Sequence, residues 1–234
     1  DIVKLKHKLV KSGTVLGHEI VAKIVEIDSE TNFKKDDVIV TSHHIPCGKC
    51  EYCKNGNVSM CRHFKETNIR PGGFSELVFV SDEHLKNVAY LKPESLTEEE
   101  ASFYEPLGCC VRAVKRASLR ENSTVLVIGL GSIGIIMAQA LKAFGMNVIG
   151  CDLLASRVQI LKNLGIEAFT LNEMCESIKA DGVFMTSGSD KAIDTALKFV
   201  RDGGKILVFS STPQNFGYAN NEIYYRELTV LGSY

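Results

Sequence analysis

The sequence lacks an excess of charge of either sign. Its 234 residues carry 27 lysines and arginines against 28 aspartates and glutamates, which leaves a formal net charge of −1 at pH 7. The basic residues form no stripe interleaved with aromatic side chains, as nucleic-acid binding requires. This balance argues against a nucleic-acid partner.

Long hydrophobic runs are also missing. No apolar segment approaches the roughly 20 residues that span a bilayer, and the first residues lack the pattern of a signal peptide. We therefore predict no membrane association and a cytoplasmic location. Internal repeats and low-complexity segments are absent too, and the length is comfortable for two domains.

Two patterns of hydrophobic residues divide the chain. Short β-type runs occupy 20–27, 36–42, 73–80 and 87–91, whereas helical spacing begins at 98–117 and strands then alternate with helices. The alternation predicts βαβ units and a parallel sheet, hence an α/β protein with an irregular β domain at 1–112 and a second domain at 113–234. Expected strands lie at 123–129, 147–152, 180–188, 205–210 and 227–233, and expected helices at 133–145, 154–165 and 190–204.

Half of the eight cysteines crowd into one short segment. Cys47, Cys50, Cys53 and Cys61 have the spacing C-x2-C-x2-C-x7-C. Four thiolates can close a tetrahedron around zinc and leave no position for water, which predicts a structural zinc lobe at 47–61. The alternatives are a reduced or disulfide-paired loop and an iron–sulfur cluster. The other four are predicted to be small buried hydrophobes; they are Cys109, Cys110, Cys151 and Cys175.

A glycine loop follows the apolar strand at 123–129. Gly129, Gly131 and Gly134 fit G-x-G-x-x-G at the start of a helix, and Asp152 closes the next strand about 20 residues later. This pattern predicts a dinucleotide site in which the helix start binds the pyrophosphate and the carboxylate binds the ribose hydroxyls. The same carboxylate would repel a 2′-phosphate, so NAD is favoured over NADP. The alternative is a glycine-rich turn that binds nothing.

The segment GHE at 17–19 places two potential metal ligands side by side. His18 and Glu19 could both face one ion only if the backbone bends between them, which makes Gly17 suggestive. Two donors do not complete a site.

In their order and spacing, these motifs resemble those of the zinc-dependent medium-chain alcohol and polyol dehydrogenases. The resemblance extends over essentially the whole length and rests on GHE at 17–19, the cysteine lobe at 47–61, GGFSE at 72–76, EPL at 105–107 and GLGSIG at 129–134. It implies a Rossmann doubly wound parallel sheet beside a GroES-like catalytic domain. It also implies zinc and NAD as cofactors, with Ser132 and Ile133 of the glycine loop at the nucleotide.

The resemblance assigns the catalytic zinc ligands. In the family these are a cysteine in a C-G-x-D segment, the histidine of GHE and a third group near the domain junction. His18 would be a ligand, Glu19 a ligand or near neighbour, and Glu105 the third group. Asp1 stands at the last letter of C-G-x-D and would accept a hydrogen bond from His18, while the cysteine would precede Asp1. We expect both termini to be truncated.

Further positions follow from the resemblance. Arg157 matches a position near the adenosine ribose, and Ser187 is a weaker cofactor contact. Glu105, where classical alcohol dehydrogenases have cysteine, resembles the polyol branch and the threonine dehydrogenases. Val3 replaces the family's proton-relay histidine, so another relay or solvent would have to serve. The remaining histidines lack ligand spacing and are interpreted as surface or loop residues; they are His7, His43, His44, His63 and His84.

The predicted function is a zinc-dependent oxidoreductase that transfers a hydride from a secondary alcohol or polyol carbon to NAD. A truncated, non-catalytic fragment that binds NAD and zinc is the alternative. A zinc-free, NADPH-dependent quinone reductase of the same fold is disfavoured by the cysteine lobe and by Asp152. The expected partner is a small alcohol or polyol, and relatives are commonly dimers or tetramers, so a homo-oligomer is expected.

Overall fold

The computed structural model describes residues 11–211 and 220–234, and the chain forms two compact units. We call Asp1–Glu105 unit 1 and Pro106–Tyr234 unit 2. The division falls inside helix α6 (Tyr104–Ala117), the same helix that contains the boundary expected at residue 113. The domain limits of 1–112 and 113–234 stay a prediction.

Unit 1 is built on a small antiparallel sheet in the order β1-β2-β3. Its strands are β1 (Ile20–Lys23), β2 (Val38–Thr41) and β3 (Ala89–Leu91), and Ile20 pairs with Thr41. Short helices fill the connections, namely α2 (Glu51–Lys54), η1 (Val58–Met60), α3 (Arg62–Glu66), α4 (Asp82–Asn87) and α5 (Glu98–Ser102).

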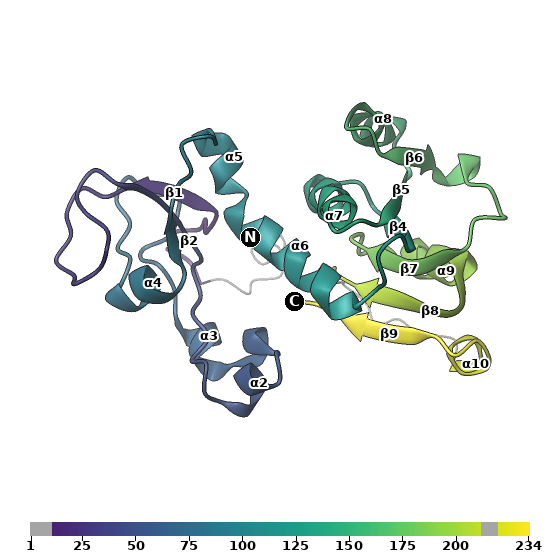
Figure 1. The fold of residues 1–234 in the computed structure, drawn as a ribbon, viewed down its shortest axis with the longest axis horizontal. Coiled ribbons are helices and arrows are strands. Elements are labelled where there is room, and N and C mark those ends of the chain that lie inside the picture. The colour runs from purple at the N-terminus through teal and green to yellow at the C-terminus, as the bar shows by residue number, and fades with distance from the viewer. Residues whose placement is uncertain (1–10, 212–219) are drawn as a thin grey trace. The chain divides into compact units, whose positions relative to one another are not determined.

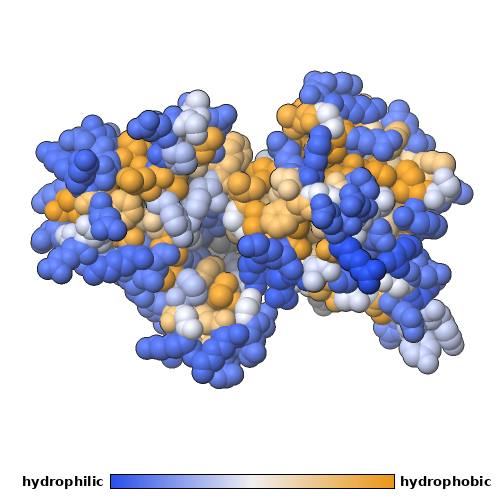
Figure 2. Space-filling model, in the orientation of Figure 1, coloured by the Kyte–Doolittle hydropathy of each residue, from blue (hydrophilic) through white to orange (hydrophobic). Residues whose placement is uncertain are grey.

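The segment 73–80 was expected to be a strand, and this expectation is wrong. Only an isolated bridge between Arg70 and Phe79 forms there. The apolar side chains of the segment are exposed, with Phe74 at 79% and Leu77 at 68%. Figure 2 shows orange hydrophobic patches among blue hydrophilic residues on the face that it presents. Alternating apolar residues are therefore insufficient for a strand when the backbone is committed to another contact, which is described below.

Unit 2 is a six-stranded parallel sheet in the order β6-β5-β4-β7-β8-β9 (Figure 1). The strands are β4 (Thr124–Ile128), β5 (Asn147–Asp152), β6 (Glu167–Thr170), β7 (Ala180–Met185), β8 (Val200–Val208) and β9 (Thr229–Gly232). Its other elements are α7 (Ser132–Ala143), α8 (Ala155–Asn163), η2 (Leu171–Glu173), α9 (Asp190–Phe199) and α10 (Asn220–Tyr225). This is the Rossmann doubly wound order, which confirms the predicted fold class.

Both faces of this sheet are buried, and strand β4 shows why. Val125 and Val127 join a core formed with α6, α7 and α8, whereas Leu126 and Ile128 join a second core formed with α9. Successive side chains of a strand point to opposite faces, so a strand covered on both sides is apolar at every position. Burial on both faces therefore accounts for the uninterrupted apolar run VLVI.

Several elements of unit 2 differ from the sequence expectation. Strand β6, helix α10 and the short helix η2 were not expected, and the helix expected over 190–204 ends at Phe199. Residues 200–204 instead begin β8, where Val200 pairs with Ala180 before a register shift. Pairing with the neighbouring strand outweighs the helical spacing there. Within the described residues, no helix combines the length and apolarity that crossing a membrane demands.

We predict that Leu126→Ala lowers the free energy of unfolding of unit 2 by about 2–5 kcal/mol, because the leucine is 0% exposed and its loss leaves a cavity. Leu164→Ala, at a leucine that is 45% exposed, is the matched control and should change it by less than about 0.5 kcal/mol. Denaturant titration followed by circular dichroism measures both. Equal effects would contradict the assignment of Leu126 to the core.

Candidate metal and nucleotide sites

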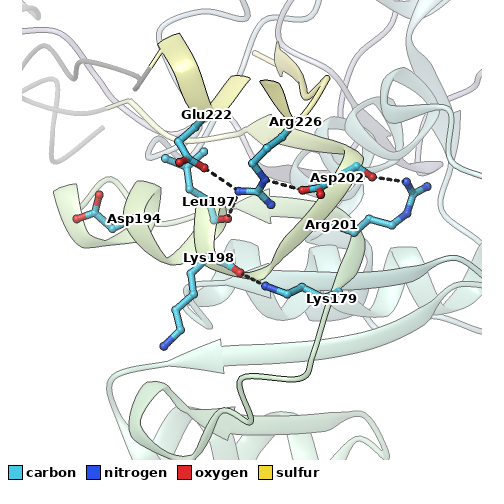
Figure 3. Close-up of a pocket in the computed structure, with 8 residues that line it drawn as sticks. All are labelled: Lys179, Asp194, Leu197, Lys198, Arg201, Asp202, Glu222 and Arg226. Carbon is cyan, nitrogen blue, oxygen red and sulfur yellow. Dashed lines mark hydrogen bonds and ion pairs between the residues drawn. The ribbon is translucent and has the colours of Figure 1, made fainter. Parts of the chain in front are cut away.

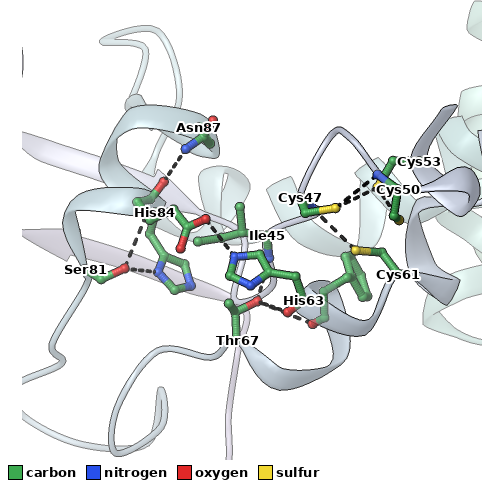
Figure 4. Close-up of polar contacts among 12 residues, drawn as sticks. Ile45, Cys47, Cys50, Cys53, Cys61, His63, Thr67, Ser81, His84 and Asn87 are labelled. Carbon is green, nitrogen blue, oxygen red and sulfur yellow. Dashed lines mark hydrogen bonds and ion pairs between the residues drawn. The ribbon is translucent and has the colours of Figure 1, made fainter.

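The four clustered cysteines converge in unit 1 (Figure 4). Helix α2 begins after Cys50 and helix α3 after Cys61, so two short helices present the thiols. The sulfur of Cys53 lies 3.6 Å from that of Cys50 and 4.0 Å from that of Cys47. The backbone N–H groups of Cys50 and Cys47 donate to the sulfurs of Cys47 and Cys61, at 3.4 and 3.5 Å.

These separations fit one zinc ion. Zinc–sulfur bonds of about 2.3 Å at tetrahedral angles place two sulfurs about 3.8 Å apart. A disulfide would bring them to about 2.05 Å, and all four cysteines are free thiols. The donor set therefore suits zinc, and four thiolates leave no open position for a substrate.

The local environment gives these thiols different pKa values. The N–H group of Cys47 lowers the pKa of Cys61 to about 6, while burial raises the pKa of Cys53 to about 12. A divalent cation would stabilise all four as thiolates and so release protons on binding.

A second group of donors consists of His18, His43 and Glu105. One ligand atom from each lies within 4.8 Å of the others, and all three side chains are half-buried. The Nδ1 atom of His43 is 3.9 Å from Oε1 of Glu105, and the rings of His18 and His43 are 4.4 Å apart between centroids. Two imidazoles and a carboxylate are zinc ligands, as in catalytic sites that keep a position open.

Sheet register brings the two histidines together. Ile20 pairs with Thr41 at the start of β1 and the end of β2. Continuing that antiparallel register by two residues places His18 opposite His43, and cross-strand neighbours lie about 4.5–5.5 Å apart. The pairing of β1 with β2 therefore brings together two imidazoles that are distant in sequence.

The position of His18 depends on a close backbone contact. Gly17 has φ of +92° and its carbonyl accepts from the N–H of Gly73, at 2.8 Å, while Phe74 donates to the carbonyl of Leu16, also at 2.8 Å. A Cβ on Gly17 would lie 2.8 Å from the nitrogen of Phe74. Only glycine fits, which explains why GHE and GGFSE occur together.

His43 has its own support. The ring Nε2 of His84 lies 3.1 Å from the carbonyl oxygen of His43. Its Nδ1 lies 2.7 Å from Oγ of Ser81, a contact that Figure 4 shows. A carbonyl only accepts, so Nε2 of His84 carries the proton and donates. His84 is 3% exposed, which corrects the interpretation of this histidine as a surface or loop residue.

The structure groups some of the expected ligands and not others. His18 and Glu105 converge, whereas Glu19 is exposed and outside the group, so its role as a ligand stays a prediction without support from the geometry. Asp1, Val3 and His7 lie outside the described residues. The sequence interpretation missed His43, whose signal is an imidazole two residues after β2, at the end of the strand that pairs with the residues following GHE.

The remaining histidines have local partners. The ring Nδ1 of His44 is hydrogen-bonded with the carbonyl of Thr67, and its ring lies 4.7 Å from that of Phe64. His63 is a surface residue whose Nε2 lies 2.7 Å from Oε1 of Glu83. Neither belongs to the group around Glu105.

Unit 2 contains a cavity of about 420 Å³ at the carboxyl ends of β4, β5 and β7. This edge is where the strand order reverses, the usual place for a nucleotide in such sheets. Predicted cofactor residues that line it are Gly129, Gly131, Asp152, Arg157 and Ser187. Residues that were not predicted include Thr186, Lys191 and Thr195, which come from the end of β7 and from α9.

The glycine loop leaves room beside this cavity. A Cβ on Gly131 would meet no atom, whereas one on Gly134 would lie 1.8 Å from the carbonyl oxygen of Gly129. Helix α7 starts there without a side-chain cap, so its first N–H groups can bind an anion. Ser132 and Ile133 do not line the cavity, and Ile133 packs into the core on the α7 side, so both remain predictions.

Asp152 braces the same loop. Its Oδ2 accepts from the N–H of Leu130 at 2.6 Å, and its Oδ1 accepts from the N–H of Leu154 at 2.9 Å. A guanidinium nitrogen of Arg157 lies 3.4 Å from Oδ2 of Asp152, and Asp152 is 8% exposed. Oδ2 also accepts from Arg157, whereas Oδ1 has a second lone pair, so the carboxylate can hold the loop and still accept from a ribose hydroxyl through Oδ1.

Two of the isolated cysteines fit the buried role and one does not. Cys110 and Cys151 are buried, and burial raises the pKa of Cys151 to about 11. Cys109 is half-buried. Cys175 is exposed, which corrects the expectation of burial, and Ser177 lowers its pKa through a side-chain hydrogen bond.

A second cavity in unit 2, of about 650 Å³, is lined by charged residues that neutralise one another (Figure 3). Arg226 contacts Asp202 at 2.7 Å and Glu222 at 3.1 Å, and donates to the carbonyl of Leu197. Lys179 donates to the carbonyl of Lys198. These contacts bind the end of α9 to β8 and α10, and the structure assigns this cavity no ligand.

Comparisons with known proteins agree with this geometry. The family model for the alcohol dehydrogenase GroES-like domain matches residues 1–90, and that for zinc-binding dehydrogenase matches 132–234. The chain is 30% identical to sorbitol dehydrogenase of Bacillus subtilis (strain 168) over 91% of its length, and 29% identical to D-arabitol-phosphate dehydrogenase of Enterococcus avium over 98%. It belongs to the zinc-dependent medium-chain dehydrogenases.

A solved structure extends the comparison to the fold. A Sinorhizobium meliloti 1021 protein bound to NADP superposes with a TM-score of 0.85 at 26% identity, covering 99% of this chain and 72% of that one. The chain spans 63% of the length of the Bacillus subtilis sorbitol dehydrogenase and 69% of the Enterococcus avium relative.

We expect Cys50→Ser to remove one tightly held zinc per chain and to destabilise unit 1, because the ion contributes folding free energy. Zinc is measured by mass spectrometry after desalting and stability by thermal melting. Cys175→Ser, at the exposed thiol, is the control and should change neither. An undiminished zinc content and melting temperature in Cys50→Ser would exclude the structural role.

Proposed function

We propose that the protein is a zinc-dependent oxidoreductase that transfers a hydride from a secondary alcohol or polyol carbon to NAD. The observation that carries the proposal is that one chain holds both parts. His18 and Glu105 converge in unit 1, and the cavity beside the glycine loop has Asp152 at its edge in unit 2. Membership of the dehydrogenase family supports the reaction class.

Two observations favour an oxygen-rich substrate. Relatives at about 30% identity are named for sorbitol and for D-arabitol phosphate. Glu105 supplies a carboxylate oxygen where classical alcohol dehydrogenases have a thiolate, and oxygen donors suit a harder, more hydrated ion. We therefore place the substrate among polyols and related secondary alcohols.

The residues divide the work in this proposal. A bound zinc ion would supply Lewis-acid catalysis at the substrate hydroxyl, and a bound nicotinamide would supply the hydride acceptor. His18 and Glu105 would hold the ion. The four cysteines hold a separate ion for structure alone. The proton relay histidine of the family is replaced by Val3, so solvent or another group carries the proton away.

NAD is the proposed cofactor. The carboxylate of Asp152 is nearly buried, lines the nucleotide cavity and accepts two backbone N–H groups. A 2′-phosphate beside it would meet a fixed negative charge. NADP binding tighter than NAD binding would instead favour a quinone reductase of the same fold.

The setting of the protein follows from its thiols and its family. All eight cysteines are free, which suits a reducing compartment, and we propose the cytoplasm. By resemblance to the family we also propose a dimer or tetramer, which light scattering of the purified protein would measure.

His18→Ala should abolish alcohol oxidation and remove the weakly held zinc, leaving one zinc per chain and unchanged NAD binding. The reason is that the imidazole is a metal ligand of unit 1, whereas the residues that line the nucleotide cavity belong to unit 2. Activity is followed by absorbance of the reduced cofactor with a panel of polyols, and NAD binding by calorimetry. His63→Ala, a surface histidine, is the control. A variant that retains activity would refute the catalytic assignment, and a wild type with a single, chelator-resistant zinc would favour the non-catalytic alternative.

Asp152→Ala should weaken NAD binding by about 10-fold or more and reduce the preference for NAD over NADP, since it removes both the ribose acceptor and a brace of the glycine loop. Zinc content should not change. Calorimetric titration with each cofactor measures this, with Asp194→Ala as a control carboxylate outside the cavity. A preference that stays constant would show that another residue selects the cofactor.

A further inference from the structure

We propose that His43 is a direct metal ligand, so that His18, His43 and Glu105 bind one divalent cation as a set of two imidazoles and one carboxylate. The family resemblance supplies His18 and Glu105 but assigns nothing to His43. This proposal concerns ion binding and does not require turnover.

The separation of His43 and Glu105 suits a shared ion. Nδ1 of His43 and Oε1 of Glu105 are 3.9 Å apart, beyond hydrogen-bond length. Two donors at zinc–ligand distances of about 2.1 Å stand about 3.4 Å apart around a tetrahedral ion. A shift of about half an ångström, well within side-chain rotation, would bring the pair to that value.

Burial strengthens the argument. The side chains of His43 and Glu105 are only 14% and 16% exposed. A carboxylate with so little solvent needs a cation or strong donors to offset the cost of desolvation. An ion between His18, His43 and Glu105 would supply that charge at the point where all three ligand atoms converge.

The backbone of His43 is fixed in the way a ligand requires. It is the second residue after β2, and its carbonyl accepts from Nε2 of the buried His84, whose other ring nitrogen is hydrogen-bonded to Ser81. Supporting contacts of this kind hold ligands in place in metal sites. His84 is therefore a positioning residue for His43.

The donor set has a chemical consequence. Two nitrogens and one oxygen provide no sulfur from these three residues, which makes the site harder than the cysteine lobe and accessible to cobalt as well as zinc. Three protein ligands also leave at least one position of a tetrahedral ion for another group. The two metal groups of unit 1 should therefore differ in exchange rate and in absorption spectrum.

Cobalt binding to the intact protein tests the proposal. The weakly held ion is removed by mild chelation that leaves the cysteine-bound zinc, and Co²⁺ is then titrated while the visible absorption is recorded. His43→Gln should weaken cobalt binding by at least about 100-fold. His44→Gln, at the adjacent imidazole that contacts Thr67, is the matched control and should stay within about 3-fold of the wild type.

A second variant guards against misfolding of the first. In His43→Cys, a thiolate bound to cobalt should add a sulfur-to-cobalt charge-transfer band. The band should be stronger than any such absorption of the wild type or of His44→Gln. Wild-type affinity in His43→Gln, or cobalt binding by His43→Cys without the added band, would overturn the proposal. Since neither readout needs substrate, a protein that binds cobalt through residue 43 but oxidises no alcohol would refute only the proposed function.

Discussion

Two backbone hydrogen bonds, between residues 16–17 and residues 73–74, fix the point from which His18 reaches its neighbours. The two backbone segments of this contact lie closer together than side chains allow. A Cβ on Gly17 would lie 2.8 Å from the nitrogen of Phe74, and one on Gly73 would lie 2.7 Å from the side chain of Ile20. Holding two glycines in one conformation costs conformational entropy, and the result is a backbone that fixes the position of the His18 imidazole. Gly73 and Phe74 therefore hydrogen-bond with residues 16–17 and not with a strand of the sheet.

The nucleotide cavity also depends on close contacts that only glycine permits. The carbonyl of Gly129 lies where a Cβ on Gly134 would be, and a Cβ on Gly129 would lie 2.8 Å from Cβ of Ser187. The turn after β4 is thus pressed against the first turn of α7 and against the end of β7. In both units the functional group stands on a loop whose path is set by contacts that only glycine permits, so each motif is recognisable by its glycines.

How far the sequence predicts such sites depends on how local their contacts are. The cysteine lobe spans 47–61 and the glycine loop 129–134, and both could be read from spacing alone, as could the double burial of β4. His43 could not, because its place beside His18 depends on the pairing of Ile20 with Thr41, a register that apolar alternation does not specify. Burial of His84 and the loss of helix after Phe199 likewise depend on partners distant in sequence.

The donor chemistry of unit 1 gives a reason for its two metal groups to coexist. Four sulfurs saturate a tetrahedral ion and include the buried Cys61, so that ion is held by soft donors away from solvent. Nitrogen and oxygen donors from His18, His43 and Glu105 do not saturate the ion they would share, and carboxylate oxygen binds water-rich ions without expelling all their solvent. Because soft and hard donors are segregated in this way, one cation can be exchanged or rehydrated at the second group while the first continues to hold the loop between α2 and α3 together.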